Sequence, residues 1–285
     1  MKVIVAGATG AVGRPLVRLL REGGHDVIGI TRSTSGATAL QAVGASAVSA
    51  DALDRESLLA ALGDQQADAV INELTDLKKA PARYAEMERT NRLRVEGSAN
   101  LLEVARRVGA TRFLTQSIFF GYGFADLCDG EISEDAPFGV ASGARTDRTL
   151  AALVSAETQA QSLPGVTGIA LRYGLFYGGD VENYVSMLRK RLLPVPTGKR
   201  GTLALIHHQD AAAATVAALE RGSAGAYNIV DDRPTTWREL IEEMARVHHA
   251  PPPVPLPKWL LRRGAVRRGD DDRRQSARIE RQSKT

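Results

Sequence analysis

The chain has 285 residues, of which 44% are hydrophobic and 25% charged, proportions that exclude a disordered protein and predict a globular one. It contains no uncharged apolar run of about 18 residues and no signal peptide, so we expect a cytoplasmic protein without a membrane partner. Cys128 is the single cysteine, which excludes an intrachain disulfide. The net charge of +4 comes from a basic tail, 262–285, on a nearly neutral body, and therefore predicts no nucleic acid partner.

Short β-branched runs alternate with segments of helical periodicity through the first 172 residues. Strands are expected at 2–6, 27–30, 46–50, 68–72, 112–116 and 167–172. Helices are expected between them at 14–22, 37–43, 55–62, 82–108 and 149–161. Such alternation predicts an α/β protein with a doubly wound parallel sheet of the Rossmann type.

The alternation loosens after Arg172, which indicates a smaller, partly interleaved C-terminal substrate lobe. A helical stretch runs to Arg191, and strands at 202–206 and 226–230 flank a helix at 210–220 with Asp210 as its N-cap. The proline-rich segment 251–257 is expected to be extended. We therefore assign 1–172 and 202–230 to the Rossmann domain, and 173–201 and 231–285 to the substrate lobe and tail.

A glycine-rich loop directly follows the first predicted strand and opens the first helix. Its glycines allow a tight turn and a close approach to a pyrophosphate, and the helix N-terminus offers free N–H groups to the anion. The sequence therefore predicts dinucleotide binding here rather than a merely structural turn. The predicted contact residues are Gly7, Thr9, Gly10, Ala11, Val12 and Gly13.

The end of the second strand bears on the choice of cofactor. An acidic residue there accepts a hydrogen bond from the ribose of NAD(H), but this strand ends in Arg32 and Ser33. A guanidinium suits the 2′-phosphate, so we predict NADP(H), although Arg32 is also readable as a solvated surface arginine.

Three further residues follow the third and fourth strands, at the sheet edge where ligands bind in this architecture. Asp51 and Ala52 are expected near the adenine, and Leu74 near the adenosine and nicotinamide side of the pocket. An equally good interpretation is that they are ordinary capping and core residues.

Several motifs in order give the chain a resemblance to the extended short-chain dehydrogenase/reductase superfamily, which includes NAD(P)-dependent epimerases and dehydratases. They are GATGAVG, the Asp51 element, Asn91 in its helical segment, the strand RFLTQS, LRYGLFYG and IHHQDAAAA, which together cover about residues 1–260. The resemblance implies a Rossmann domain with a smaller C-terminal lobe. It also implies cofactor contacts at Asn91, Tyr173, Leu175 and Phe176.

Family members normally carry a Tyr and a Lys four residues apart on one helix, which together move a proton. The resemblance places these positions at Thr149 and Leu153, and neither side chain is suited to that task. The family's Ser or Thr after the fifth strand corresponds to Gln116, with Ser117 beside it. We therefore predict catalytic roles for Ser117, Gln116 and Thr149 as hydrogen-bond donors that orient a substrate but do not titrate.

Aromatic residues are sparse, yet four gather just after the fifth strand, which suits a flat apolar substrate as well as it suits a lobe core. They are Phe119, Phe120, Tyr122 and Phe124, and Tyr177 extends the same expected wall. No metal is expected, because the pairs 207–208 and 248–249 lack a third ligand.

The leading hypothesis is an NADPH-dependent reductase of a ketone on a bulky aromatic or polyketide-type metabolite, with the proton supplied by water or by the substrate. Within the superfamily the chain resembles the ketoreductases of angucyclinone and aminocoumarin pathways that lack the usual triad. The alternative is a non-catalytic NADP(H) sensor that binds a protein partner. The resemblance further suggests a homodimer through 82–108 and 149–161.

Overall fold

The computed structural model describes the chain except for residues 63–64, 78–83, 124–130, 180, 198–201 and 258–285. Phe124, Cys128 and the basic tail therefore lie outside the described residues. The chain forms two compact units, the first made of 1–179 and 204–232, and the second of the described parts of 180–203 and 233–257.

The first unit is built on a seven-stranded sheet in which every neighbouring pair is parallel. In spatial order its strands are β11 (Gly225–Ile229), β6 (Thr167–Tyr173), β5 (Arg112–Ile118), β4 (Ala69–Asn72), β1 (Lys2–Ala6), β2 (Asp26–Thr31) and β3 (Ser46–Ser49). The predicted doubly wound α/β sheet is confirmed. All seven strands end at one edge, so the segments that follow them meet there.

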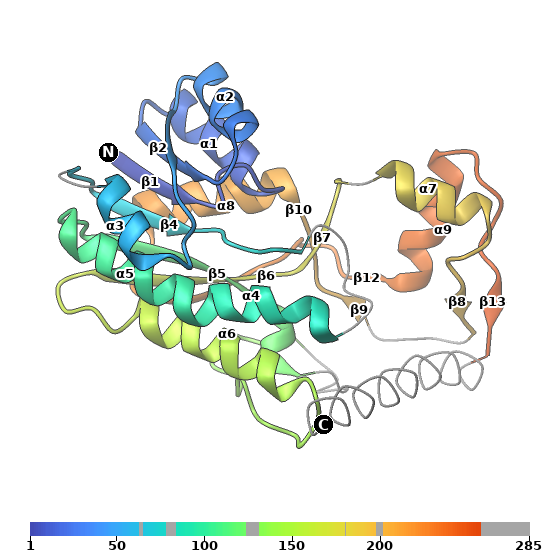
Figure 1. Cartoon of the computed structure of the whole chain (residues 1–285). Helices are drawn as coiled ribbons and strands as arrows, with labels where there is room; N and C mark the ends of the chain where they lie inside the picture. Colours follow the sequence, from blue (N-terminus) through green and yellow to red (C-terminus); the bar gives the residue numbers. More distant parts are fainter. Residues whose placement is uncertain (63–64, 78–83, 124–130, 180, 198–201, 258–285) are drawn as a thin grey trace, which may run out of the picture. The chain divides into compact units, whose positions relative to one another are not determined.

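Helices cover both faces of this sheet (Figure 1). On one face lie α1 (Gly13–Glu22), α2 (Thr34–Ala42) and α8 (His208–Arg221). On the other lie α3 (Arg55–Leu62), α5 (Ser98–Arg107) and α6 (Asp147–Ala160). Each layer buries an apolar stripe against Val, Ile and Leu side chains of the strands, which explains the continuous apolar runs in the sequence.

The helix expected at 82–108 is interrupted. Its described part begins with the 3₁₀ turn η1 (Tyr84–Met87) and continues through α4 (Glu88–Arg92) and the π-helical turn η2 (Leu93–Gly97) into α5. A π turn adds a residue to the helix and shifts the face that the following turns present. Helical periodicity alone does not reveal such an insertion.

The single strand predicted at 202–206 is wrong. β9 (Thr202–Leu203) pairs antiparallel with β12 (Thr235–Thr236) in the second unit, whereas β10 (Leu205–His207) pairs in parallel with β7 (Leu175–Tyr177) in the first. The chain passes between the units at Ala204, whose carbonyl accepts a hydrogen bond from the Leu175 N–H.

The second unit has its own small core. Its elements are α7 (Val181–Arg189), β8 (Val195–Pro196), β9, β12, α9 (Trp237–Val247) and β13 (Pro255–Leu256). Leu188, Val195 and Ile241 are almost fully buried within it. β13 lies in the segment expected to be extended and pairs with β8.

The predicted N-cap at Asp210 is also wrong. β10 continues to His207, so α8 begins at His208, and His207 Nδ1 accepts the cap hydrogen bond from the Gln209 N–H at 3.3 Å. Asp210 instead lies in the first turn, where its charge interacts favourably with the helix dipole. In the described part of the chain, no helix is long and apolar enough to cross a membrane.

Candidate dinucleotide and substrate site

The glycine-rich loop is packed so tightly that two of its glycines admit no side chain. Gly7 has a φ of +81°, and a Cβ there would lie 2.3 Å from the Glu73 carbonyl oxygen. A Cβ on Gly13 would lie 2.1 Å from the Gly7 carbonyl oxygen. No side chain caps α1, the Arg14 N–H donates to the Gly10 carbonyl at 3.1 Å and Pro15 has no N–H, so the Gly13 N–H is the group at this helix start that is left to bind an anion. This cradle fits the pyrophosphate of a dinucleotide.

The remaining loop residues keep the backbone in this shape. The Gly10 N–H donates to the Gly7 carbonyl at 2.9 Å, and Arg14 Nε donates to the Thr9 carbonyl at the same distance. Val12 is buried and Ala11 exposed. These hydrogen bonds and the buried Val12 therefore fix the backbone of the loop, while Ala11 faces the solvent.

Four charged side chains meet where β2, β3 and β4 end, and we call them the charge ring: Arg32, Asp51, Asp76 and Arg89. Asp51 Oδ2 lies 2.8 Å from Arg89 Nη2 and 3.8 Å from Arg32 Nη1. Asp76 Oδ1 lies 3.4 Å from Arg32 Nη2 and 3.6 Å from Arg89 Nε. Cations and anions thus alternate around the ring.

The ring favours the ionised form of the Asp51 carboxyl. Burial raises the pKa of Asp51, but the Leu53 N–H and the guanidinium groups of Arg89 and Arg32 outweigh burial, so that pKa is lowered overall. The hydroxyl of Ser33, next to the predicted phosphate ligand Arg32, accepts a hydrogen bond from the Gly36 N–H at 3.1 Å and caps α2.

The other predicted adenosine residues are joined to helices and to β5. The Ala52 carbonyl accepts a hydrogen bond from Asn100 Nδ2 at 2.8 Å. The Leu74 N–H donates to Asn72 Oδ1 at 3.2 Å, and the Leu74 carbonyl accepts from Gln116 Nε2. The predicted catalytic Gln116 and cofactor residue Leu74 are therefore in direct contact.

A second contact joins the predicted catalytic Thr149 to the predicted cofactor residue Asn91. Asn91 Nδ2 donates to Thr149 Oγ1 at 3.3 Å, which ties α4 to α6. Leu153, one turn further along α6, is fully buried. The position that the resemblance assigns to the family's Lys is thus a core position in this chain.

Ser117 belongs to a buried ionic network. Its hydroxyl donates to Glu157 Oε1 at 2.5 Å, and Arg172 binds both oxygens of that carboxylate, the shortest contact being 2.8 Å. Arg172 Nη1 also donates to the Tyr122 hydroxyl, which in turn donates to Asn228 Oδ1 at 2.7 Å. The hydroxyl groups of Ser117 and Tyr122 therefore already donate hydrogen bonds to other residues of the protein.

A buried acid that the sequence analysis missed lies beside the glycine-rich loop. Glu73 follows β4, and its Oε1 accepts a hydrogen bond at 2.8 Å from the hydroxyl of Tyr173, which contacts Thr215 Oγ1 at 2.6 Å. Glu73 Oε2 is buried without a hydrogen-bond partner in the described structure. Burial raises the pKa of Glu73 to about 8, so the carboxyl is mostly protonated at neutral pH.

The aromatic residues after β5 and β6 form separate groups, one of which is the edge-on pair of Tyr122 and Phe138, with ring centroids 5.2 Å apart. The rings of Phe119 and Phe120 lie 4.3 Å apart and are half-buried. Phe176, in β7 with Leu175, stacks on His208 at 5.1 Å. Tyr177 is 37% exposed, and the partial burial of this residue together with a hydrogen bond to Asp231 raises the pKa of its hydroxyl to about 12.

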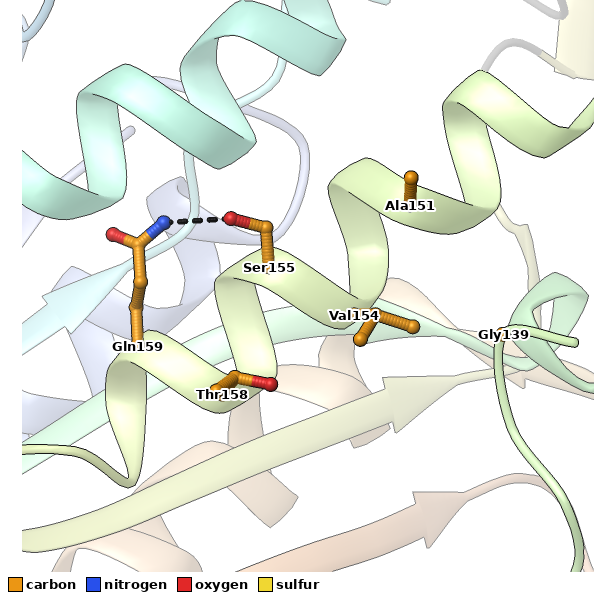
Figure 2. Close-up of a pocket in the computed structure, with 6 residues that line it drawn as sticks. All are labelled: Gly139, Ala151, Val154, Ser155, Thr158 and Gln159. Carbon is orange, nitrogen blue, oxygen red and sulfur yellow. Dashed lines mark hydrogen bonds between the residues drawn. The ribbon is translucent and has the colours of Figure 1, made fainter.

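A pocket of about 460 Å³ lies on the outer face of α6 (Figure 2). Its lining residues are Gly139, Ala151, Val154, Ser155, Thr158 and Gln159. They alternate with buried residues of the same helix such as Leu153 and Glu157, so the pocket is on the side of α6 that faces away from the ionic network. Among the described residues, no cluster of three His, Cys, Asp or Glu has the arrangement of a metal site.

Glu73 and Arg89 differ in whether the sequence alone could have identified them. Glu73 was detectable, because an acid directly after a buried strand is unusual. Arg89 was not, because 38 residues separate it from Asp51 and no spacing rule joins them.

Comparisons with known proteins place these features in context. The family model described as the NAD dependent epimerase/dehydratase family matches residues 3–230. A 3-diazoavenalumate denitrifying reductase from a Streptomyces species is 38% identical over 275 residues, which cover 92% of this chain and 86% of that protein.

Solved structures agree on the fold. UDP-glucose 4-epimerase from Thermotoga maritima, solved with UDP-glucose, has a TM-score of 0.73 at 22% identity and covers 90% of this chain and 86% of that one. A dTDP-glucose 4,6-dehydratase double mutant from Streptomyces venezuelae, solved with NAD, has a TM-score of 0.72 at 20% identity, covering 90% and 84%.

Proposed function

This chain belongs to the NAD dependent epimerase/dehydratase family, and on that premise we propose that it is an NADPH-dependent reductase that removes the diazo group from an aromatic secondary metabolite. The observation that carries the proposal is an intact dinucleotide cradle in a chain whose helix α6 has Thr149 and Leu153 at the positions that the resemblance assigns to the family's proton-moving pair. When bound, the cofactor supplies a hydride.

Reduction of a diazo group does not require the Tyr and Lys that move a proton in other members of the family. An aryl diazonium ion that accepts a hydride on its terminal nitrogen becomes a neutral aryl diazene. The diazene then loses N₂: its C–N and N–H bonds break and the hydrogen forms a C–H bond at the same ring carbon, so atoms and charge balance without a proton from the protein. The Streptomyces relative, a denitrifying reductase by name, supports this choice.

A ketone is the second candidate, supported by the aromatic residues Phe119, Phe120, Phe176 and Tyr177 near the carboxyl ends of β5 and β6. Hydride transfer to a ketone leaves an alkoxide that needs a proton, and Thr149, Gln116 and Ser117 have no pKa suited to giving one. In that case the proton would come from water or from a phenol on the substrate itself.

The test is turnover with NADPH of an ortho-hydroxyaryl diazo compound, made by diazotising 3-amino-4-hydroxybenzoate, beside a panel of polycyclic ketones. NADPH labelled with deuterium at the transferred position should place deuterium on the ring carbon that loses N₂. Gly13→Val, which fills the cradle, controls for reduction in free solution. Reduction of ketones alone would favour the second candidate, and binding of NADPH without turnover of either class would favour the sensor.

Thr149→Val should lower turnover by less than about tenfold, because the loss of one orienting hydrogen bond costs on the order of 1 kcal/mol. Ser117→Ala should act similarly on turnover of the folded protein, since its hydroxyl already donates to Glu157. A thousandfold loss in steady-state kinetics while NADPH still binds would identify the side chain as the proton donor and contradict this prediction.

We also propose a homodimer through the helices at 84–107 and 147–160. Val95 is exposed beside Gln159, which lines the pocket on α6, and Val140 is exposed next to Gly139 on its rim. Light scattering should find twice the chain mass of 30.5 kDa, and Val95→Asp should shift the mass toward one chain. A single 30.5 kDa species for the unaltered protein would refute the dimer.

A further inference from the structure

The charge ring leaves Arg32 outnumbered by carboxylates. Arg32 is the residue that the strand pattern predicts to meet a 2′-phosphate, but both Asp51 and Asp76 lie within 4 Å of its guanidinium. One cation with two anions gives a local charge of −1, and a phosphate dianion would be repelled by it. Arg32 alone is therefore a poor basis for binding NADP(H).

Arg89 restores the balance. Its Nη2 lies 2.8 Å from Asp51 and its Nε lies 3.6 Å from Asp76, so it interacts with both carboxylates that oppose Arg32. With two cations and two anions the ring is neutral. Arg89 comes from α4, a different element from the end of β2 that carries Arg32.

The two guanidinium groups retain donors for a ligand. A guanidinium has five N–H donors, whereas the recorded hydrogen bonds to the ring carboxylates are one from Arg32, at 3.4 Å, and one from Arg89. The side chains of Arg32 and Arg89 are 52% and 37% exposed, so solvent and ligands reach both of them.

We infer that Arg89 is a second cation for the 2′-phosphate and a specificity-determining residue for NADP(H) over NAD(H). This inference rests on the proposed NADPH-dependent function. Arg32 and Arg89 bind the phosphate together, while Asp51 and Asp76 hold the two guanidinium groups beside each other. Removal of Arg89 leaves the ring with a charge of −1, which favours a ribose with free hydroxyls that can donate to the carboxylates.

The experiment is titration calorimetry of NADPH and NADH at one fixed ionic strength. Arg89→Gln keeps most of the side chain's length and should weaken NADPH binding about 10- to 100-fold, as expected for the loss of a charge-assisted contact, with less than about threefold change for NADH. Arg89→Lys keeps the charge and should retain most of the preference. Arg18→Ala is the control, because Arg18 is an exposed arginine that pairs with Glu22 on α1 and has no recorded interaction with the ring carboxylates.

A second variant tests the charge balance independently. Asp76→Asn raises the local charge by one while its amide oxygen keeps the acceptor that faces Arg32 and Arg89, so it should strengthen NADPH binding several-fold, with little effect on NADH. Equal losses for both cofactors in Arg89→Gln, or weaker NADPH binding in Asp76→Asn, would overturn the inference. Melting curves confirm that each variant is folded.

The outcomes separate this inference from the proposed function. If the unaltered protein prefers NADPH, and Arg32→Ala removes the preference while Arg89→Gln keeps it, the role of Arg89 is wrong and the proposed function stands. If the unaltered protein shows no preference for NADPH, the proposed cofactor itself is wrong.

Discussion

Arg172→Met will destabilise the first unit by about 3–5 kcal/mol, the usual cost of leaving a buried charge without its partner. Arg172 and Glu157 are 8% and 9% exposed, and the guanidinium is the only cation recorded against that carboxylate in the described structure. Loss of Arg172 leaves Glu157 with the Ser117 hydroxyl alone. Urea denaturation at pH 7, followed by circular dichroism, measures the change in the free energy of unfolding.

Two variants make this result specific. Adding Glu157→Met to Arg172→Met should recover much of the loss, because the buried charge is then gone as well. Arg55→Met, which breaks a surface pair with Glu103, should change the free energy of unfolding little, since exposed pairs are screened by water. A loss in Arg172→Met no larger than that in Arg55→Met would mean that water reaches Glu157 in the folded protein.

Stability will fall as pH rises from about 5 to 8, and Glu73→Gln will remove that fall. The folded carboxyl has a pKa of about 8 against an ordinary value of 4.5, so in this range it stays protonated in the folded chain and ionises in the unfolded chain. Unfolding then releases a proton and becomes easier at higher pH. The difference corresponds to on the order of 4 kcal/mol between the two ends of the range.

The measurement is urea denaturation of both proteins at intervals between pH 5 and 9. Carboxyls with lowered pKa values, such as Asp51, reach their full contribution near pH 5 and add no slope above it. The difference between the two proteins therefore isolates Glu73. If the free energy of unfolding of the two proteins changed with pH in parallel, the Glu73 carboxyl would have its ordinary pKa in the folded chain, and the prediction would be wrong.

Strong local patterns made most of the fold predictable. The β-branched runs identified the strands of the sheet. The glycine-rich loop was identified because glycine is required at Gly7 and Gly13, where a side chain would clash with the backbone. The strands β8, β9, β12 and β13 have two residues each, too few to show a periodicity. These strands form because they pair with partners that are distant in the sequence.

The polar contacts of the site were less predictable than the fold. Ser117 was expected to present a free hydroxyl, yet it donates to Glu157, 40 residues away. The bond between Tyr173 and Glu73 spans 100 residues. The sequence predicted which residues reach the carboxyl edge of the sheet, but the partner of each side chain depends on the distances between strands and helices in the folded chain.

The interleaving of the two units has a consequence for synthesis on the ribosome. When residue 203 has emerged from the ribosome, the residues of α7, β8 and β9 are outside it, but those of α9, β12 and β13, against which they pack in the folded chain, have not yet emerged. The nascent chain must then complete the sheet of the first unit with β11 before the missing partners emerge. Residues 181–197 and 202–203 therefore spend this interval without the partners that bury Leu188 and Val195, the stage at which a chaperone would protect the chain most.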